Sequence, residues 1–181
     1  MNILLEEFAT PFNTVPFNQI QKDYYLPALK EAIRMGTQEI NAIKTSPEEP
    51  NFNNTIEKLE RSGELVDRIS RIFFNLNAAE TNPEIQQLAK EISPLLTAYA
   101  NDITLDQELF NRVDAVYRQC DTLNLNTEQK TLLDKLYKGF IRNGANLDEI
   151  GKKQLREIDQ QLGQLSLTFG ATLNGYITKN S

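Results

Sequence analysis

A stretch of strong helical periodicity, Asn54–Thr81, constrains the fold of this chain more than any other segment. Its apolar positions recur in steps of three and four and form one stripe, made of Ile56, Leu59, Gly63, Val66, Ile69, Phe73 and Leu76. Leu65, Ile72 and Phe74 lie off that stripe, so more than one face is expected to be covered. We therefore predict a central helix about 40 Å long, against which the other elements pack.

The same spacing predicts the other helices when it is combined with residues that start and stop helices. We expect these helices at Lys22–Lys44, from Pro83 to about Ile103, at Asp106–Asp121, from Thr127 to Asn143-Gly144, and from Leu147 onward. Expected caps are Asn54 with Glu57, Asn82 before Pro83, and Gly144. The last helix is expected to bury Leu155, Ile158, Leu162, Leu165 and Phe169.

The first twenty residues have no helical period, and two prolines disfavour a helix there. We predict an extended lead-in whose large apolar side chains lie over the helical body, namely Phe8, Phe12, Val15 and Phe17. Disorder is the alternative. At the other end Leu173, Tyr176 and Ile177 continue an apolar stripe to the last residues, which predicts a chain cut before its natural end; a frayed tail is the alternative.

Acid–base pairs on the central helix indicate a solvated face rather than a binding site. Each acid precedes its base by four residues, as in Glu57–Arg61, Glu64–Arg68 and Asp67–Arg71. This order stabilises a helix by a few tenths of a kcal/mol per pair. Cys120 is expected to be a small buried hydrophobic residue rather than a reactive thiol.

Composition narrows the function classes. The 181 residues are 40% hydrophobic and 24% charged, which suits one or two globular domains with a real core. The net charge of −6 argues against a nucleic-acid partner, because phosphate binding needs clustered Lys and Arg. No segment has the length of a membrane span, and none has the pattern of a signal peptide.

A search for catalytic and metal-binding motifs finds none. The chain has no histidine and one cysteine, so it lacks H-E-x-x-H, C-x-x-C and every Ser-His or Cys-His pair. Carboxylate pairs occur at expected helix ends and loops, where solubility or helix-end charge explains them better than glycosidase chemistry: Glu6-Glu7, Glu48-Glu49 and Asp148-Glu149. An N-cap explains Asn53-Asn54-Thr55 better than glycosylation does. We assign no catalytic, cofactor-binding or metal-ligating residue in this chain.

Several stretches in order resemble the N-terminal region of the zinc oligopeptidases, the family that includes thimet oligopeptidase, oligopeptidase A and peptidyl-dipeptidase Dcp. These stretches are PFNTVPF at 11–17, DYYLPALKEAI at 23–33, the run from Pro50 to Asn82, EISPLL at 91–96, LDQELFNRVDAVY at 105–117, and the run from Leu123 to Leu147. The resemblance covers nearly the whole chain and is strongest at Asn51–Asn82. The bacterial Dcp and oligopeptidase A branch is the most similar.

The resemblance implies an all-α fold, a multi-helix bundle of about six helices, in which residues 1–181 form a single helical N-terminal lobe. In this family zinc sits on an H-E-x-x-H helix in the C-terminal part, so the resemblance implies zinc in a catalytic domain that this chain lacks. The implied role is non-catalytic: one wall of a channel that admits short peptides. The implied partners are those peptides and the catalytic domain, and the implied location is the cytoplasm, or the periplasm if a leader is removed.

Two other readings stay open at this point. The same scaffold suits a stand-alone helical protein-interaction module, which shares the predicted fold but has no catalytic half. An unrecognised enzyme within this chain alone would turn over substrate without a bound transition metal, and no residue pattern favours it. We expect that the chain alone neither binds zinc tightly nor cleaves peptides.

Overall fold

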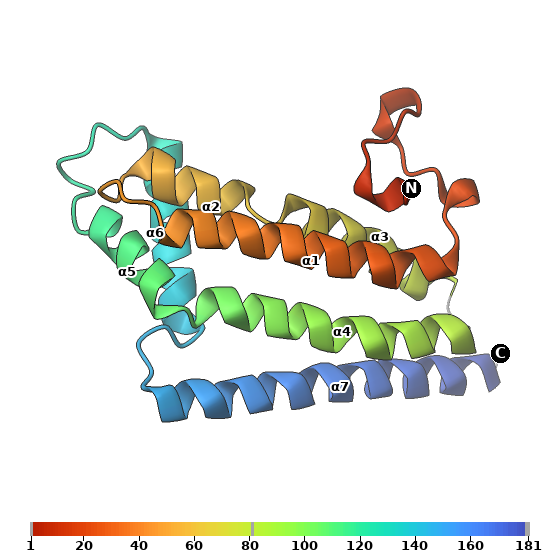
Figure 1. Ribbon diagram of the computed structural model, residues 1–181. Coiled ribbons are helices and arrows are strands. Elements are labelled where there is room, and N and C mark those ends of the chain that lie inside the picture. Colours follow the sequence, from red (N-terminus) through yellow and green to blue (C-terminus); the bar gives the residue numbers. More distant parts are fainter. Residues whose placement is uncertain (1, 81, 180–181) are drawn as a thin grey trace. The chain divides into compact units, whose positions relative to one another are not determined.

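The computed structural model describes residues 2–80 and 82–179, and the regular elements of these residues are helical (Figure 1). The backbone, but not the side chains, is described at 171 and 173–179, so the expected stripe of Leu173, Tyr176 and Ile177 lies outside the described side chains. The α-helices are α1 (Lys22–Lys44), α2 (Lys58–Arg61), α3 (Glu64–Ala79), α4 (Pro83–Thr104), α5 (Gln107–Tyr117), α6 (Thr127–Arg142) and α7 (Glu149–Lys179). The all-α prediction is confirmed.

The chain divides into two compact units, and three helices each contribute to both. Unit 1 comprises Met1–Gly36, Gly63–Thr97 and Asp159–Ser181, and unit 2 comprises Thr37–Ser62 and Ala98–Ile158. The divisions fall inside α1, α4 and α7, and at the short break between α2 and α3. Each unit has its own buried side chains.

Unit 1 is built on α3 and the first half of α1, which lie side by side (Figure 1). The ring of Tyr25 on α1 meets Phe73 on α3 edge to face, with centroids 5.2 Å apart. Both side chains are fully buried, as is Ile69 one turn earlier on α3. The predicted apolar stripe therefore forms the core of this unit, and the burial of Ile72 confirms that a second face is covered.

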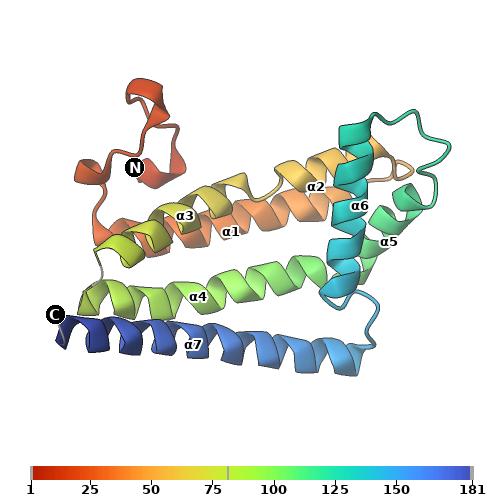
Figure 2. The same cartoon turned by 180° about the vertical axis from the view of Figure 1, so that it is seen from behind.

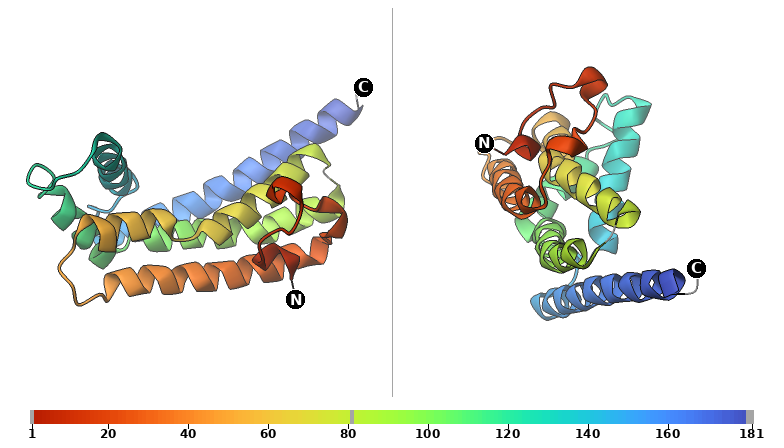
Figure 3. Two further views of the ribbon diagram at one scale, coloured as in Figure 1. Left: turned by 90° about the horizontal axis from the view of Figure 1, so that it is seen from above. Right: turned by 90° about the vertical axis from the view of Figure 1, so that its right-hand side faces the viewer.

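The N-terminal segment consists of three single 3₁₀ turns, Ile3–Leu5, Pro11–Asn13 and Phe17–Gln19, and it lies beside α3 (Figure 3). Arg68 on α3 holds it there: its Nη2 donates to the carbonyl oxygens of Leu4 and Glu6, at 2.9 Å each. The guanidinium also lies over the Phe8 ring, 5.1 Å from its centroid. Leu4 and Phe8 are buried against the unit.

Two of the four aromatic and aliphatic residues expected to cover the body do not do so. Phe12 is 99% exposed and Phe17 is exposed, whereas Phe8 is buried and Val15 half-buried. The backbone explains Phe12, because its φ of 59° and the φ of 53° at Asn13 make a left-handed turn. Such a turn is rare for a bulky residue.

Unit 2 has an aromatic core between α5 and α6, which lie side by side (Figure 2). Tyr117 on α5 stacks on Tyr137 on α6, with centroids 3.8 Å apart and rings within 5° of parallel. Phe110 packs between Tyr137 and Phe140, 5.9 Å from each centroid. Cys120 packs against this cluster but is only half-buried, so it is more exposed than the predicted buried residue.

The prediction of one helix over Asn54–Thr81 is wrong, because the segment breaks at Ser62-Gly63. Ser62 is extended, with a ψ of 142°, and Gly63 is left-handed, with a φ of 74°. The predicted capping box is also wrong: the element begins with a π-helical turn at Phe52–Glu57, capped by Asn51. The Asn51 side chain accepts from the Asn54 amide, and the Asn54 side chain accepts from the Asn51 amide, at 2.9 Å each.

Other predicted ends and pairs are confirmed. Helix α1 has the predicted bounds, and the Asn82 side chain accepts from the amides of Glu84 and Ile85 at the start of α4. Gly144, with a φ of 90°, follows α6. Two expected ion pairs form, Glu57–Arg61 at 2.6 Å and Asp67–Arg71 at 2.8 Å. The expected Glu64–Arg68 pair is replaced by the contacts of Arg68 with the N-terminal segment.

The stripe expected to be buried on the last helix faces solvent instead. Leu155 is half-buried, but four residues are between 51% and 70% exposed: Ile158, Leu162, Leu165 and Phe169. In unit 1, α7 approaches α4 with a different side. A Cβ added to Gly163 would lie 3.4 Å from the Ser93 hydroxyl and 3.5 Å from that of Thr97. The apolar residues of α7 have the predicted spacing, but the face that they form is exposed rather than covered.

Candidate functional site

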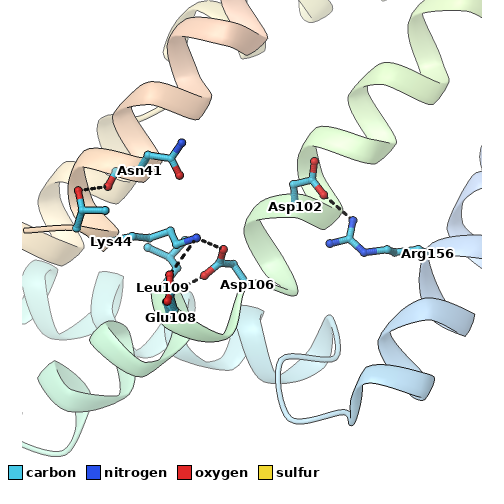
Figure 4. A network of polar contacts seen from close by, with 8 residues as sticks. Asn41, Lys44, Asp102, Asp106, Glu108, Leu109 and Arg156 are labelled. Atoms are coloured by element: carbon cyan, nitrogen blue, oxygen red, sulfur yellow. Dashed lines mark hydrogen bonds and ion pairs between the residues drawn. The ribbon is translucent and has the colours of Figure 1, made fainter.

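A polar hollow of unit 2 is lined in part by Asp106, which forms an ion pair at the start of α5. Lys44, the last residue of α1, places its Nζ 2.5 Å from Oδ2 of Asp106 and 3.4 Å from Oε2 of Glu108 (Figure 4). The side chains of Lys44 and Asp106 are only 17% and 19% exposed. The hydrogen bond to Asp106 is the main reason that the pKa of Lys44 is raised, so the ammonium stays charged at neutral pH.

Asp106 has a second structural role. Its Oδ1 accepts from the backbone amide of Leu109 at 2.8 Å, which makes it the N-cap of α5. One carboxylate thus joins the end of α1 to the start of α5, with one oxygen for the ammonium and one for the helix end. This arrangement is a joint between helices, because both oxygens are already occupied.

The opposite border of the hollow is formed by α4 and α7. Arg156 on α7 donates to Oδ1 of Asp102 on α4 at 2.7 Å (Figure 4). One turn earlier on α7, Lys152 is 5% exposed. Its Nζ donates to Oε1 of Gln107 at 3.0 Å and lies 3.8 Å from Oε1 of Glu149. A buried ammonium is costly unless polar groups surround it, so these contacts fix Lys152 in place.

The hollow itself has a volume of about 370 Å³, and Tyr99 is among the residues that line it. The Tyr99 hydroxyl is buried and has no hydrogen-bond partner among the described residues. Burial, and secondarily the charge of Glu39, raise the pKa of Tyr99, so the phenol is neutral. Each charged group of the lining has an oppositely charged neighbour, so the hollow presents paired ions and one phenol but no activated nucleophile or base.

Two further hollows are less polar. One in unit 1, about 460 Å³, lies between the starts of α1 and α4 and is bordered by the Lys22–Glu84 ion pair. The other, about 270 Å³, lies in unit 2 between α1 and α2 beside Ile43 and Arg61. Their linings combine aliphatic stems with surface charges and bring no set of catalytic groups together.

The residues present do not fit a zinc site. The sequence has no histidine, and within residues 2–80 and 82–179 the structure brings together no group of three or more His, Cys, Asp or Glu that could hold a metal ion. The assignment of no catalytic, cofactor-binding or metal-ligating residue to this chain stays a prediction. The three carboxylate pairs are exposed and lie apart, Glu6-Glu7 and Glu48-Glu49 outside the helices and Asp148-Glu149 at the start of α7. Asn54 and Thr55 are buried in the π-helical turn.

Comparison with known proteins finds no matching family model but clear relatives. The chain is 38% identical over 173 residues to a dipeptidyl carboxypeptidase of Escherichia coli, covering 96% of this chain and 25% of that protein. It is 23% identical over 164 residues to oligopeptidase A of Salmonella typhimurium, covering 91% and 24%. A thimet-like oligopeptidase of Dictyostelium discoideum is 26% identical over 156 residues, covering 84% and 23%.

The aligned region is a small part of each relative. They cover nearly all of this chain, yet the chain spans only about a quarter of the length of each of these relatives. No described helix combines the length and the apolar character needed to cross a membrane.

Proposed function

We propose that this chain, a sequence relative of the thimet oligopeptidase family over nearly its whole length, is the non-catalytic N-terminal helical lobe of a zinc-dependent oligopeptidase of the dipeptidyl carboxypeptidase type. The observation that carries the proposal is the alignment with the E. coli dipeptidyl carboxypeptidase, 38% identical over 96% of this chain. An alignment that is nearly complete on one side and covers 25% of the other is what a lobe of a larger enzyme produces.

The lobe has a structural role in this proposal. It forms one wall of a channel that admits short peptides, while the zinc and the groups that act on the peptide bond belong to the catalytic domain outside this chain. The internal polar contacts support a fixed scaffold. Arg112 of α5, for example, donates to the backbone carbonyls of Ser46 and Glu48, at 3.1 and 3.2 Å, and so ties down the loop after α1.

The proposed setting is the cytoplasm, with short peptides as substrates and the enzyme's own catalytic domain as the structural partner. Names of relatives support the substrate class, since they describe a dipeptidyl carboxypeptidase and oligopeptidases. A net charge of −6 and the paired surface ions are in keeping with a solvated lobe rather than a nucleic-acid surface.

Peptide hydrolysis by the full gene product and by the 181-residue chain tests this proposal. We expect the full product to cleave short unstructured peptides, to lose that activity with a chelator, and to regain it with zinc. The chain alone should cleave none of these peptides and should retain no stoichiometric zinc. Chelator-sensitive cleavage by the chain alone would refute the proposal, and so would an inactive but folded and zinc-loaded full product.

A further inference from the structure

The second part of α7 is uncharged, unlike the rest of the chain. From Gln160 to Thr178 the sequence contains no Asp, Glu, Lys or Arg, although 24% of the whole chain is charged. The first part of the same helix is rich in charge, with Lys152, Arg156 and Asp159 among its residues. Protein interfaces are depleted of charge at their centre, whereas solvent-facing helices normally are not.

This uncharged part exposes large apolar side chains on one face. Leu162, Leu165 and Phe169 are 55%, 65% and 70% exposed. Their spacing of three and four residues places them on the same side of the helix. We call these three residues the outer face of α7. An exposed apolar row on an uncharged stretch of helix is unusual for a surface that stays in water.

Unit 1 does not use the outer face for its own packing. The contact of α7 with α4 is made at Gly163, where an added Cβ would meet the hydroxyl groups of Ser93 and Thr97. Gly163 is about 100° around the helix from Leu162 and about 160° from Leu165. The side of α7 that contacts α4 is thus already small and polar, and the apolar side is left over.

We propose that the outer face of α7 docks against an apolar helical surface in the part of the longer peptidase that lies outside residues 1–181. This inference rests on the proposed function, because the occupant is the rest of that enzyme. Relatives such as the E. coli dipeptidyl carboxypeptidase are about four times as long as the aligned region, so most of such a protein is available to cover this face. An uncharged row of Leu and Phe suits an obligate, permanently covered interface.

Cysteine accessibility in the full gene product tests the proposal. In a Cys120→Ser background, Leu165→Cys reports on the outer face, and Gln164→Cys, which is also exposed in α7 but points elsewhere, is the matched control. Any other cysteines of the full product are replaced as well. The alkylation rate of each cysteine is measured in the folded protein and in urea.

We expect folding to slow alkylation at position 165 by about 100-fold or more and at position 164 by less than about threefold. Equal rates at position 165 in the folded and unfolded protein would overturn the proposal. So would protection that disappears when the protein is diluted to a monomer, because the occupant would then be a second copy.

Failure of the docking and failure of the proposed function give different results. A full product that cleaves short peptides but is alkylated freely at position 165 refutes the docking and leaves the function intact. A full product that is protected at position 165 but cleaves no peptide supports the docking and refutes the function.

Discussion

Replacement of Asp106 tests the joint between α1 and α5. Asp106→Ala removes the N-cap of α5, which costs about 1 kcal/mol. It also leaves the Lys44 ammonium, whose side chain is 17% exposed, with only Glu108 at 3.4 Å. A pair at this depth lies between an exposed pair, worth about 0–1 kcal/mol, and a fully buried one, whose truncation costs about 3–5 kcal/mol. We expect Asp106→Ala to lower the free energy of unfolding by about 2–3 kcal/mol in total.

Asp106→Asn separates the two contributions, because asparagine caps helices as well as aspartate but carries no charge. This variant should lose only the ionic part, about 1–2 kcal/mol. The matched control is Arg118→Ala, which removes an exposed partner of Asp114 and should cost less than about 0.5 kcal/mol. Urea unfolding followed by circular dichroism at pH 7 measures all three. Equal losses for Asp106→Ala and Arg118→Ala would refute the reasoning.

Three other perturbations have definite expected outcomes. Gly63→Ala should destabilise the chain by about 1 kcal/mol or more, because the backbone of Gly63 is left-handed. Gly139→Ala should stabilise the chain by up to about 1 kcal/mol, because Gly139 lies inside α6 and an added Cβ there would meet no atom within 4 Å. Urea unfolding midpoints compare the two variants, and stabilisation by both would contradict this prediction. Phe12→Gly should raise the melting temperature or leave it unchanged, because Phe12 is 99% exposed in a left-handed turn that glycine adopts readily. A melting temperature lower by several degrees would contradict this prediction, because it would show that Phe12 makes a stabilising contact. The free energy of unfolding should fall above about pH 10, because the pKa values of Tyr25, Tyr99 and Lys44 are all raised in the folded state. The stability that these groups contribute is complete below their unfolded-state pKa values and is lost as the pH rises through their folded-state values. A free energy of unfolding that stays constant between about pH 9 and 11.5 would contradict this prediction.

The sequence was a good guide wherever a local signal was unambiguous. The bounds of α1, the cap at Asn82 and the left-handed Gly144 follow from local chemistry: apolar spacing, a side-chain acceptor before a proline, and a glycine after the last helical turn. These features depend only on the few residues around them, so tertiary contacts had no reason to override them.

The errors arose where two structures satisfy the same pattern. The apolar steps of three and four continue through Ser62-Gly63, although the backbone there leaves the helix. A glycine inside a helical pattern is compatible both with a continuous helix and with a left-handed break. The periodicity also identifies the outer face of α7 as apolar, but it does not show that unit 1 leaves this face exposed.

The candidate site was less accessible to sequence reasoning than the fold. Asp106 begins the predicted helix Asp106–Asp121, but its pairing with Lys44 joins residues 62 positions apart and has no local signal. The burial of Lys152 had no signal, because lysine on a helix is most often exposed. Conversely, the absence of histidine is evident from the sequence, so these 181 residues cannot supply an H-E-x-x-H motif.

The intact mass of the native gene product, measured in extracts of its source cells, tests the central claim most directly. The account predicts a product several times heavier than the 20.7 kDa of these 181 residues, and about four times heavier if it matches the length of its relatives. A native product of about 20.7 kDa would contradict the account, because the lobe would then exist without a catalytic domain.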